Sequence, residues 1–169
     1  MDQVGRTGRR SNVMTSDEIL AEYPKLAGTE WQPTSLPDSL YNCVAWALAE
    51  DKTRWWEPYY FEEPQYYWPT DCLPRTHPGT VEAYTPAFKV MGFSNCEDGA
   101  IEEDFEKIAI YASEGDEFMH VARQLENGHW TSKLDCRDDI QHQTPEGVEN
   151  EYYGKVVRYM KRPRHNAKS

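Results

Sequence analysis

The stretch that decides the fold is FMHVARQLENGHWTSKL, residues 118–134. Two runs rich in apolar, β-branched and aromatic side chains flank Asn127-Gly128, and this dipeptide between such runs is the strongest short-range signal of a β-hairpin. We expect strands over residues 118–126 and 129–135, with Asn127 and Gly128 as the two turn residues. In that register His120 lies opposite Asp135, so the hairpin places a carboxylate beside an imidazole.

Further strands and helices are indicated on both sides of this hairpin. Residues 106–112 alternate polar and apolar side chains, and residues 155–160 provide a closing strand. Helices are expected over residues 16–23, from Cys43 to near Asp51, and over residues 80–91. The sequence therefore predicts an α+β domain in which N-terminal helices pack on an antiparallel sheet of about four strands.

Composition bounds the organisation of the chain and its partners. With 169 residues, we expect one domain over residues 15–163 and disordered tails at 1–14 and 164–169. Lys and Arg number 18 against 29 Asp and Glu, which gives a net charge of −11 and argues against nucleic acid as a partner. The oligomeric state is left open.

Hydropathy and cysteine content indicate the compartment. The chain has no apolar run of about 20 residues and no secretory signal, so we expect a cytoplasmic protein that does not enter a membrane. The four cysteines have no paired spacing, which favours reduced thiols. A zinc site at Cys72 with His77 and Cys136 with His142 is a rival use, but both gaps are longer than is usual for structural zinc, and we expect no metal or other cofactor.

Cys43 is the candidate nucleophile. It lies where an amphipathic helix is expected to begin, and free backbone N–H groups at a helix start favour a thiolate. Cysteine is also among the most buried residue types, so a small core residue is the alternative interpretation.

His120 is the candidate base, with Asp135 as the group that orients its ring. A bulge in the hairpin would replace Asp135 by another neighbour such as Ser132, Lys133 or Asp139. A satisfied histidine in a sheet is the alternative for His120. His142 either completes the site or caps an exposed turn, and the two glutamines beside it favour the cap.

An aromatic segment follows the Cys43 helix. It begins at Trp55 and Trp56, runs to Pro69, and has no clean helical or strand period. Large rings in such a segment form either a hydrophobic lid over the core or one wall of a binding cleft.

Three fragments carry a resemblance to a known superfamily: YNCVAWA at 41–47, HVA at 120–122, and TSKL at 131–134 followed by DIQH at 139–142. Their order resembles the papain-like superfamily, which includes transglutaminase-like proteins and NlpC-type cell-wall peptidases. They are also similar to a small, mostly bacterial family related to amidase-like proteins with a YNCHSYA motif. This chain departs from that motif at Val44, where the relatives have His, and near Asp135, where they have a small residue.

The resemblance implies a papain-like fold and a cysteine hydrolase or acyl transferase that acts on an amide, ester or isopeptide bond of a peptide or small molecule. Cys43 would attack the carbonyl carbon, His120 would move the proton, and the backbone N–H of Cys43 with the side chain of Asn42 would hold the oxyanion. We assign substrate contacts to Asn42, Trp55, Trp56 and Ser132. The alternative is a protein-binding or immunity-type module that has lost catalysis and holds its partner through the Trp and Tyr surface.

Overall fold

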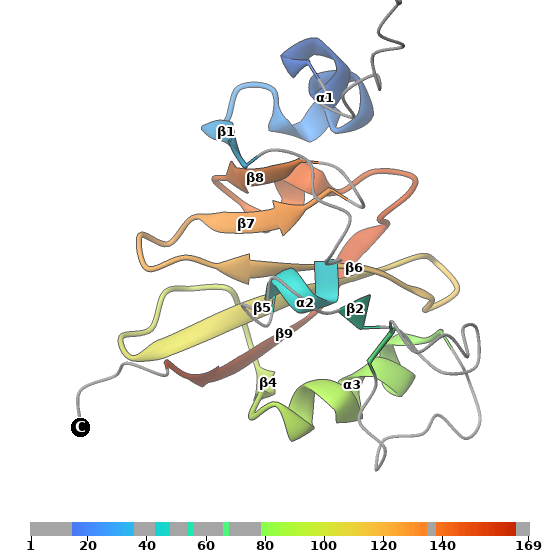
Figure 1. The fold of residues 1–169 in the computed structure, drawn as a ribbon, viewed down its shortest axis with the longest axis vertical. Helices are drawn as coiled ribbons and strands as arrows, with labels where there is room; N and C mark the ends of the chain where they lie inside the picture. The colour runs from blue at the N-terminus through green and yellow to red at the C-terminus, as the bar shows by residue number, and fades with distance from the viewer. Residues whose placement is uncertain are drawn as a thin grey trace, which may run out of the picture.

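A computed structural model describes residues 15–35, 43–47, 54–55, 66–67, 79–134 and 138–164. Its main feature is an antiparallel sheet of seven strands in the order β1-β8-β7-β6-β5-β9-β4 (Figure 1). Those strands are β1 (Trp31–Ser35), β4 (Ser94–Cys96), β5 (Phe105–Ala112), β6 (Phe118–Gln124), β7 (Trp130–Lys133), β8 (Asp139–His142) and β9 (Lys155–Pro163). A separate parallel pair joins β2 (Arg54–Trp55) to β3 (Tyr66–Tyr67).

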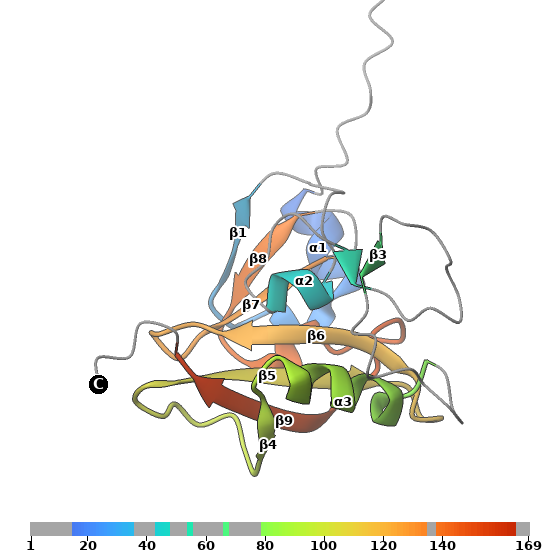
Figure 2. The same cartoon turned by 60° about the horizontal axis from the view of Figure 1, so that its bottom comes forward.

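Short helices cover the two faces of the large sheet. On one face, α2 (Cys43–Ala47) and α3 (Val81–Val90) pack on a cluster that includes Ile108, Ile110 and Val121, which we call the α3-side core (Figure 2). On the other face, α1 (Ser16–Glu22) and the 3-10 helices η1 (Pro24–Leu26) and η3 (Pro145–Val148) pack on a second cluster that includes Ala109, Tyr111 and Ala122. We call this second cluster the α1-side core.

Local sequence explains where the helices begin and end. Thr15 caps α1 in a capping box with Glu18. The helix ends at Glu22, Tyr23 is its C-cap, and Pro24 follows directly. Thr80 caps α3, whose chain passes through Pro86 without a break and ends before Gly92, where φ is +96°. The predicted helices at these two places are confirmed in position.

The predicted fold class is wrong. The protein is β-rich, with one seven-stranded sheet, and the α-helices within its described residues are only 7, 5 and 10 residues long. It is not an α+β papain-like domain with N-terminal helices on about four strands. Strands β1, β4 and β8 were not anticipated. β1 contains Pro33, which a strand tolerates here because β1 lies at the edge of the sheet.

The hairpin exists, but its predicted register is wrong by one residue. Gln124 pairs with Trp130 and Arg123 with Thr131, and a hydrogen bond between Leu125 and His129 closes a turn of three residues, 126–128. The Leu125 N–H donates to the His129 carbonyl at 2.7 Å, and Gly128 takes the left-handed conformation at φ +86° that such a turn requires. The register that placed His120 opposite Asp135 is therefore not formed, and Asp135 lies outside the described residues.

The predicted tails are residues 1–14 and 164–169. Apart from Arg164, whose backbone N–H donates to the Asp104 carbonyl at 2.8 Å, these residues lie outside the described part of the chain. Within the described part, no helix is long and apolar enough to cross a membrane.

Candidate functional site

His120 sits where strand β6 changes its pairing. Tyr111 of β5 pairs with His120 and Ala112 pairs with Phe118, so Met119 is an extra residue in a β-bulge. On the other side, β6 pairs with β7 only at the hairpin end, through Arg123 and Gln124. His120 thus lies at the end of β6 where pairing to β7 has stopped, and bulges of this kind re-aim a side chain.

A chain of side-chain hydrogen bonds bridges the strands at this place. The Oγ of Ser132 on β7 lies 3.0 Å from Nε2 of His120 and 2.8 Å from Nε2 of His142 on β8. The Nδ1 of His142 lies 2.7 Å from the carbonyl oxygen of Thr144. All three side chains that form this relay, His120, Ser132 and His142, are fully buried.

Burial fixes the protonation of the two imidazoles. Desolvation lowers the pKa of His142 from 6.5 to about 4, although the hydrogen bond to the Thr144 carbonyl opposes this change. Desolvation, with the neighbouring His142 as a smaller cause, also lowers the pKa of His120 well below 6.5. Both rings are therefore neutral at neutral pH.

The relay then has a single direction. A carbonyl oxygen only accepts, so His142 carries its proton on Nδ1 and donates it to Thr144, which leaves Nε2 as an acceptor. Ser132 must donate its hydroxyl proton to that Nε2, and its oxygen accepts from Nε2–H of His120. His120 is thereby held as the Nε2–H tautomer, with a lone pair on Nδ1. Among the described residues, no hydrogen-bond partner reaches this Nδ1 atom.

Two tyrosines fix the plane of the His120 ring. The ring of Tyr153 stacks on it with centroids 4.1 Å apart and planes only 2° from parallel. The Tyr111 ring packs at 5.1 Å, and its hydroxyl donates to the Pro145 carbonyl at 2.6 Å. The base is therefore held by contacts from β5, β7 and the connection between β8 and β9.

Cys43 is the first described residue of α2, which packs against β6 and β7. Its side chain is partly buried against the α3-side core. The His120 ring packs on Tyr111, which belongs to the α1-side core. The two predicted catalytic side chains, Cys43 and His120, therefore pack against opposite faces of the sheet. The structure brings their elements together, and no hydrogen bond joins His120 to Cys43.

The other predicted site residues have different outcomes. Ser132, expected as a substrate contact or as an alternative orienting group, contacts His120 directly. Trp55 belongs to β2, but its side chain lies outside the description, as do Asn42, Trp56 and Asp135 altogether. Cys72, His77 and Cys136 of the rival zinc site are also outside it, and the described residues hold no cluster of three or more potential metal ligands.

Two features were missed or misread in the sequence. Of the two alternatives for His142, completing the site or capping an exposed turn, the sequence favoured the cap. The residue is instead buried in β8, where Trp130 is its cross-strand partner. On the opposite face of the same strands, Lys133 and Asp139 form a fully buried ion pair with 3.4 Å between Nζ and Oδ1. The local hydropathy pattern gave no signal for either feature, because the isolated Ile140 in a polar segment is too short for a periodicity argument.

One protein-family model matches most of this chain. A domain of unknown function, DUF7689, matches residues 32–161, which include every strand of the large sheet except the ends of β1 and β9. The chain belongs to the DUF7689 family. No curated protein and no solved structure matches it. The relay residues His120, Ser132 and His142 all lie within the DUF7689 domain, as does Cys43.

Proposed function

We propose that this DUF7689 protein is a cysteine hydrolase or acyl transferase that cleaves an amide, ester or isopeptide bond. Its nucleophile is Cys43, and its base is His120. The observation that carries the proposal is the direction of the relay, because it leaves the His120 ring with a lone pair on Nδ1. A ring held in this tautomer is what a general base for a thiol requires.

The position of α2 supplies the nucleophile. The helix that begins at Cys43 packs on both β6 and β7, the strands that carry His120 and Ser132. Pairing between β6 and β7 is confined to Arg123 and Gln124, so no ladder of backbone hydrogen bonds closes the sheet beside His120. Catalytic hydrogen bonds are often long in an unliganded enzyme and tighten when substrate binds. In the unliganded protein the two side chains pack on opposite faces of the sheet. The proposal therefore requires that the Cys43 thiol reach Nδ1 between β6 and β7, in the part of the two strands that is not paired, when substrate binds.

The chemistry follows from a neutral base. As Cys43 Sγ attacks the carbonyl carbon, its proton moves to Nδ1 of His120, and the same proton then goes to the leaving nitrogen or oxygen. The resulting thioester is opened by water in a hydrolase or by another nucleophile in a transferase. Because burial disfavours an imidazolium here, His120 acts by taking the proton during attack and not by storing a thiolate beforehand.

Alkylation tests the pair without knowledge of the substrate. Purified protein is treated with iodoacetamide across neutral and mildly acidic pH, and the labelled cysteines are located by mass spectrometry. Cys43 should react faster than Cys96, whose thiol pKa is raised by burial. His120→Gln should slow the labelling of Cys43 about tenfold or more, while the control His129→Gln, a change in a half-exposed histidine, should not.

The opposite result would favour the other class of function. If Cys43 reacts no faster than Cys96, and His120→Gln changes nothing although the variant folds, the catalytic pair does not exist. The relay would then be a structural network, and a binding role for the protein would be the interpretation to pursue.

A further inference from the structure

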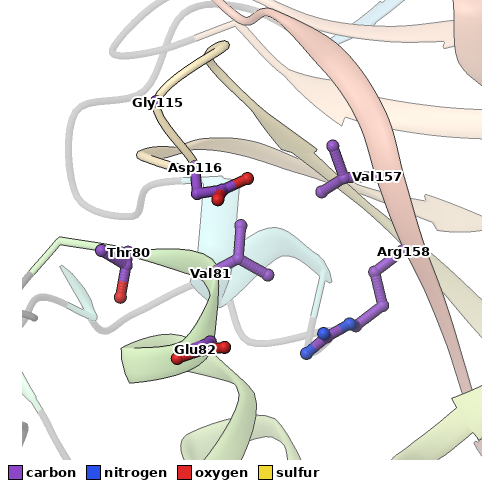
Figure 3. A pocket seen from close by; sticks show the side chains of 7 residues that line it. All are labelled: Thr80, Val81, Glu82, Gly115, Asp116, Val157 and Arg158. Carbon is purple, nitrogen blue, oxygen red and sulfur yellow. The ribbon is translucent and has the colours of Figure 1, made fainter.

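A cavity of about 500 Å³ lies away from the relay, between the first turn of α3, the β5–β6 turn and β9 (Figure 3). Figure 3 shows Arg158 extending from β9 toward α3, with Val81 and Asp116 across the cavity. Its lining consists of Thr80, Val81, Glu82, Gly115, Asp116, Val157 and Arg158. The cavity belongs to no part of the proposed reaction.

Arg158 is the unusual residue of this cavity. Its side chain is half-buried, and its one described hydrogen bond runs from Nη1 to the Thr85 hydroxyl at 2.6 Å. No carboxylate of the described residues lies within 4.0 Å of it. By contrast, the partly or fully buried cations Lys107, Lys161 and Arg162 each pair with a glutamate. In a chain of net charge −11, a half-buried arginine with no carboxylate beside it is a candidate binding site for an anion from solution.

Thr85 holds the guanidinium in place. The Thr85 hydroxyl donates to the Val81 carbonyl at 2.7 Å, so its oxygen is left to accept from Arg158. A guanidinium has five donors in a rigid fork, which matches the two oxygens of a carboxylate. Fixing the fork before a ligand arrives lowers the entropy lost on binding.

The other lining residues narrow the class of ligand. Glu82 and Asp116 are exposed carboxylates in the same cavity, and they repel ligands that carry several negative charges. Val157, which is 49% exposed, provides the apolar surface, and Val81, which is only 5% exposed, lines the cavity beside it. A single carboxylate on an apolar body therefore fits better than a phosphate.

We propose that the cavity at Arg158 is a binding site for a small monocarboxylate with an apolar body. The carboxylate pairs with the Arg158 guanidinium, and the apolar body lies over Val81 and Val157. This site is separate from the Cys43 and His120 pair, so its existence does not depend on the proposed reaction.

The test uses the whole protein and two matched probes, N-acetyl-leucine and N-acetyl-leucinamide, which differ only in the carboxylate. Binding is followed by the NMR shifts of the backbone amides of Asp116, Val157 and Arg158. N-acetyl-leucine should saturate these shifts, and the amide should bind at least about tenfold more weakly. Arg158→Gln should lower the affinity for N-acetyl-leucine by a similar factor. Lys89→Gln, which makes the same charge change in the last turn of α3, should leave this affinity unchanged.

Three results would overturn the assignment. Equal binding of the two probes, or no binding of either to the wild type, removes the carboxylate site, whether or not Arg158→Gln folds. Unchanged affinity in a folded Arg158→Gln variant removes the role of the arginine. Inorganic phosphate that shifts the same amides more strongly than N-acetyl-leucine contradicts the preference for a monocarboxylate.

Discussion

Replacing His142 should remove a large part of the acid sensitivity of this protein. In the native state the pKa of His142 is lowered by burial from 6.5 to about 4. Between these values the unfolded chain binds a proton that the native state does not, so stability rises with pH through this window and is lost as pH falls. The difference amounts to about 3 kcal/mol, because one pKa unit is worth about 1.4 kcal/mol.

Most of this loss falls within an accessible range. Moving from about pH 7.5 to about pH 5 should cost the wild type about 2 kcal/mol through His142 alone, with His120 acting in the same direction. His142→Gln leaves no group to be protonated at this position. Its fall in stability over the same range should be smaller by about 2 kcal/mol, although at neutral pH it is less stable because Ser132 loses its acceptor.

The assay is urea unfolding at the two pH values, followed by tryptophan fluorescence. Carboxylates titrate in both proteins and contribute equally to both. The difference between wild type and variant in the free energy of unfolding lost from the higher to the lower pH therefore reports on His142. Val90→Ala, an exposed substitution on α3 that changes no titratable group, is the control and should keep the wild-type pH dependence. If wild type and His142→Gln lose the same free energy between the two pH values, the ring of His142 is not buried in its neutral form and the reasoning on the relay fails.

Two further predictions concern buried contacts outside the relay. Lys133→Met should destabilise the protein by about 3–5 kcal/mol, because it removes the partner of the buried Asp139 carboxylate. Adding Asp139→Leu should recover at least half of that lost stability. Thermal melts in which the two substitutions cause additive losses would contradict this prediction. Gly154→Ala should cost about 3 kcal/mol or more, since its Cβ would lie 1.9 Å from the Ala112 carbonyl oxygen, whereas Gly28→Ala, with nothing within 4 Å, should cost only about 1 kcal/mol for its positive φ. Equal losses in the two glycine variants would show that the chain at residue 154 is free to move.

The sequence was informative where structure is local. α3 has its apolar spacing and its Thr80 cap within ten residues, and β5 has its own alternation, so both were predicted near their true positions. The hairpin was predicted from Asn127-Gly128, but the same two residues fit a two-residue or a three-residue turn. The choice between them depends on packing along the whole of β6 and β7.

The sheet as a whole depends on contacts that a local pattern does not contain. β8 carries one apolar residue, Ile140, and its polar residues are buried only because partners from distant strands satisfy them. His142 is buried through Ser132 and Thr144, and Asp139 through Lys133. For the same reason the group that orients His120 was predicted from the hairpin register as Asp135, whereas the hydrogen bond that the structure shows comes from Ser132, three residues earlier on β7.

The central claim is that Ser132 and His142 prepare His120 to take the Cys43 proton. The most direct measurement is the rate of Cys43 alkylation as a function of pH in the wild type and in Ser132→Ala, a variant that removes one oxygen from the relay and keeps both histidines. The account predicts that wild-type Cys43 stays reactive below neutral pH, and that Ser132→Ala shifts its profile upward toward the ordinary thiol pKa of about 8.5. Superimposable profiles for the two folded proteins would contradict it.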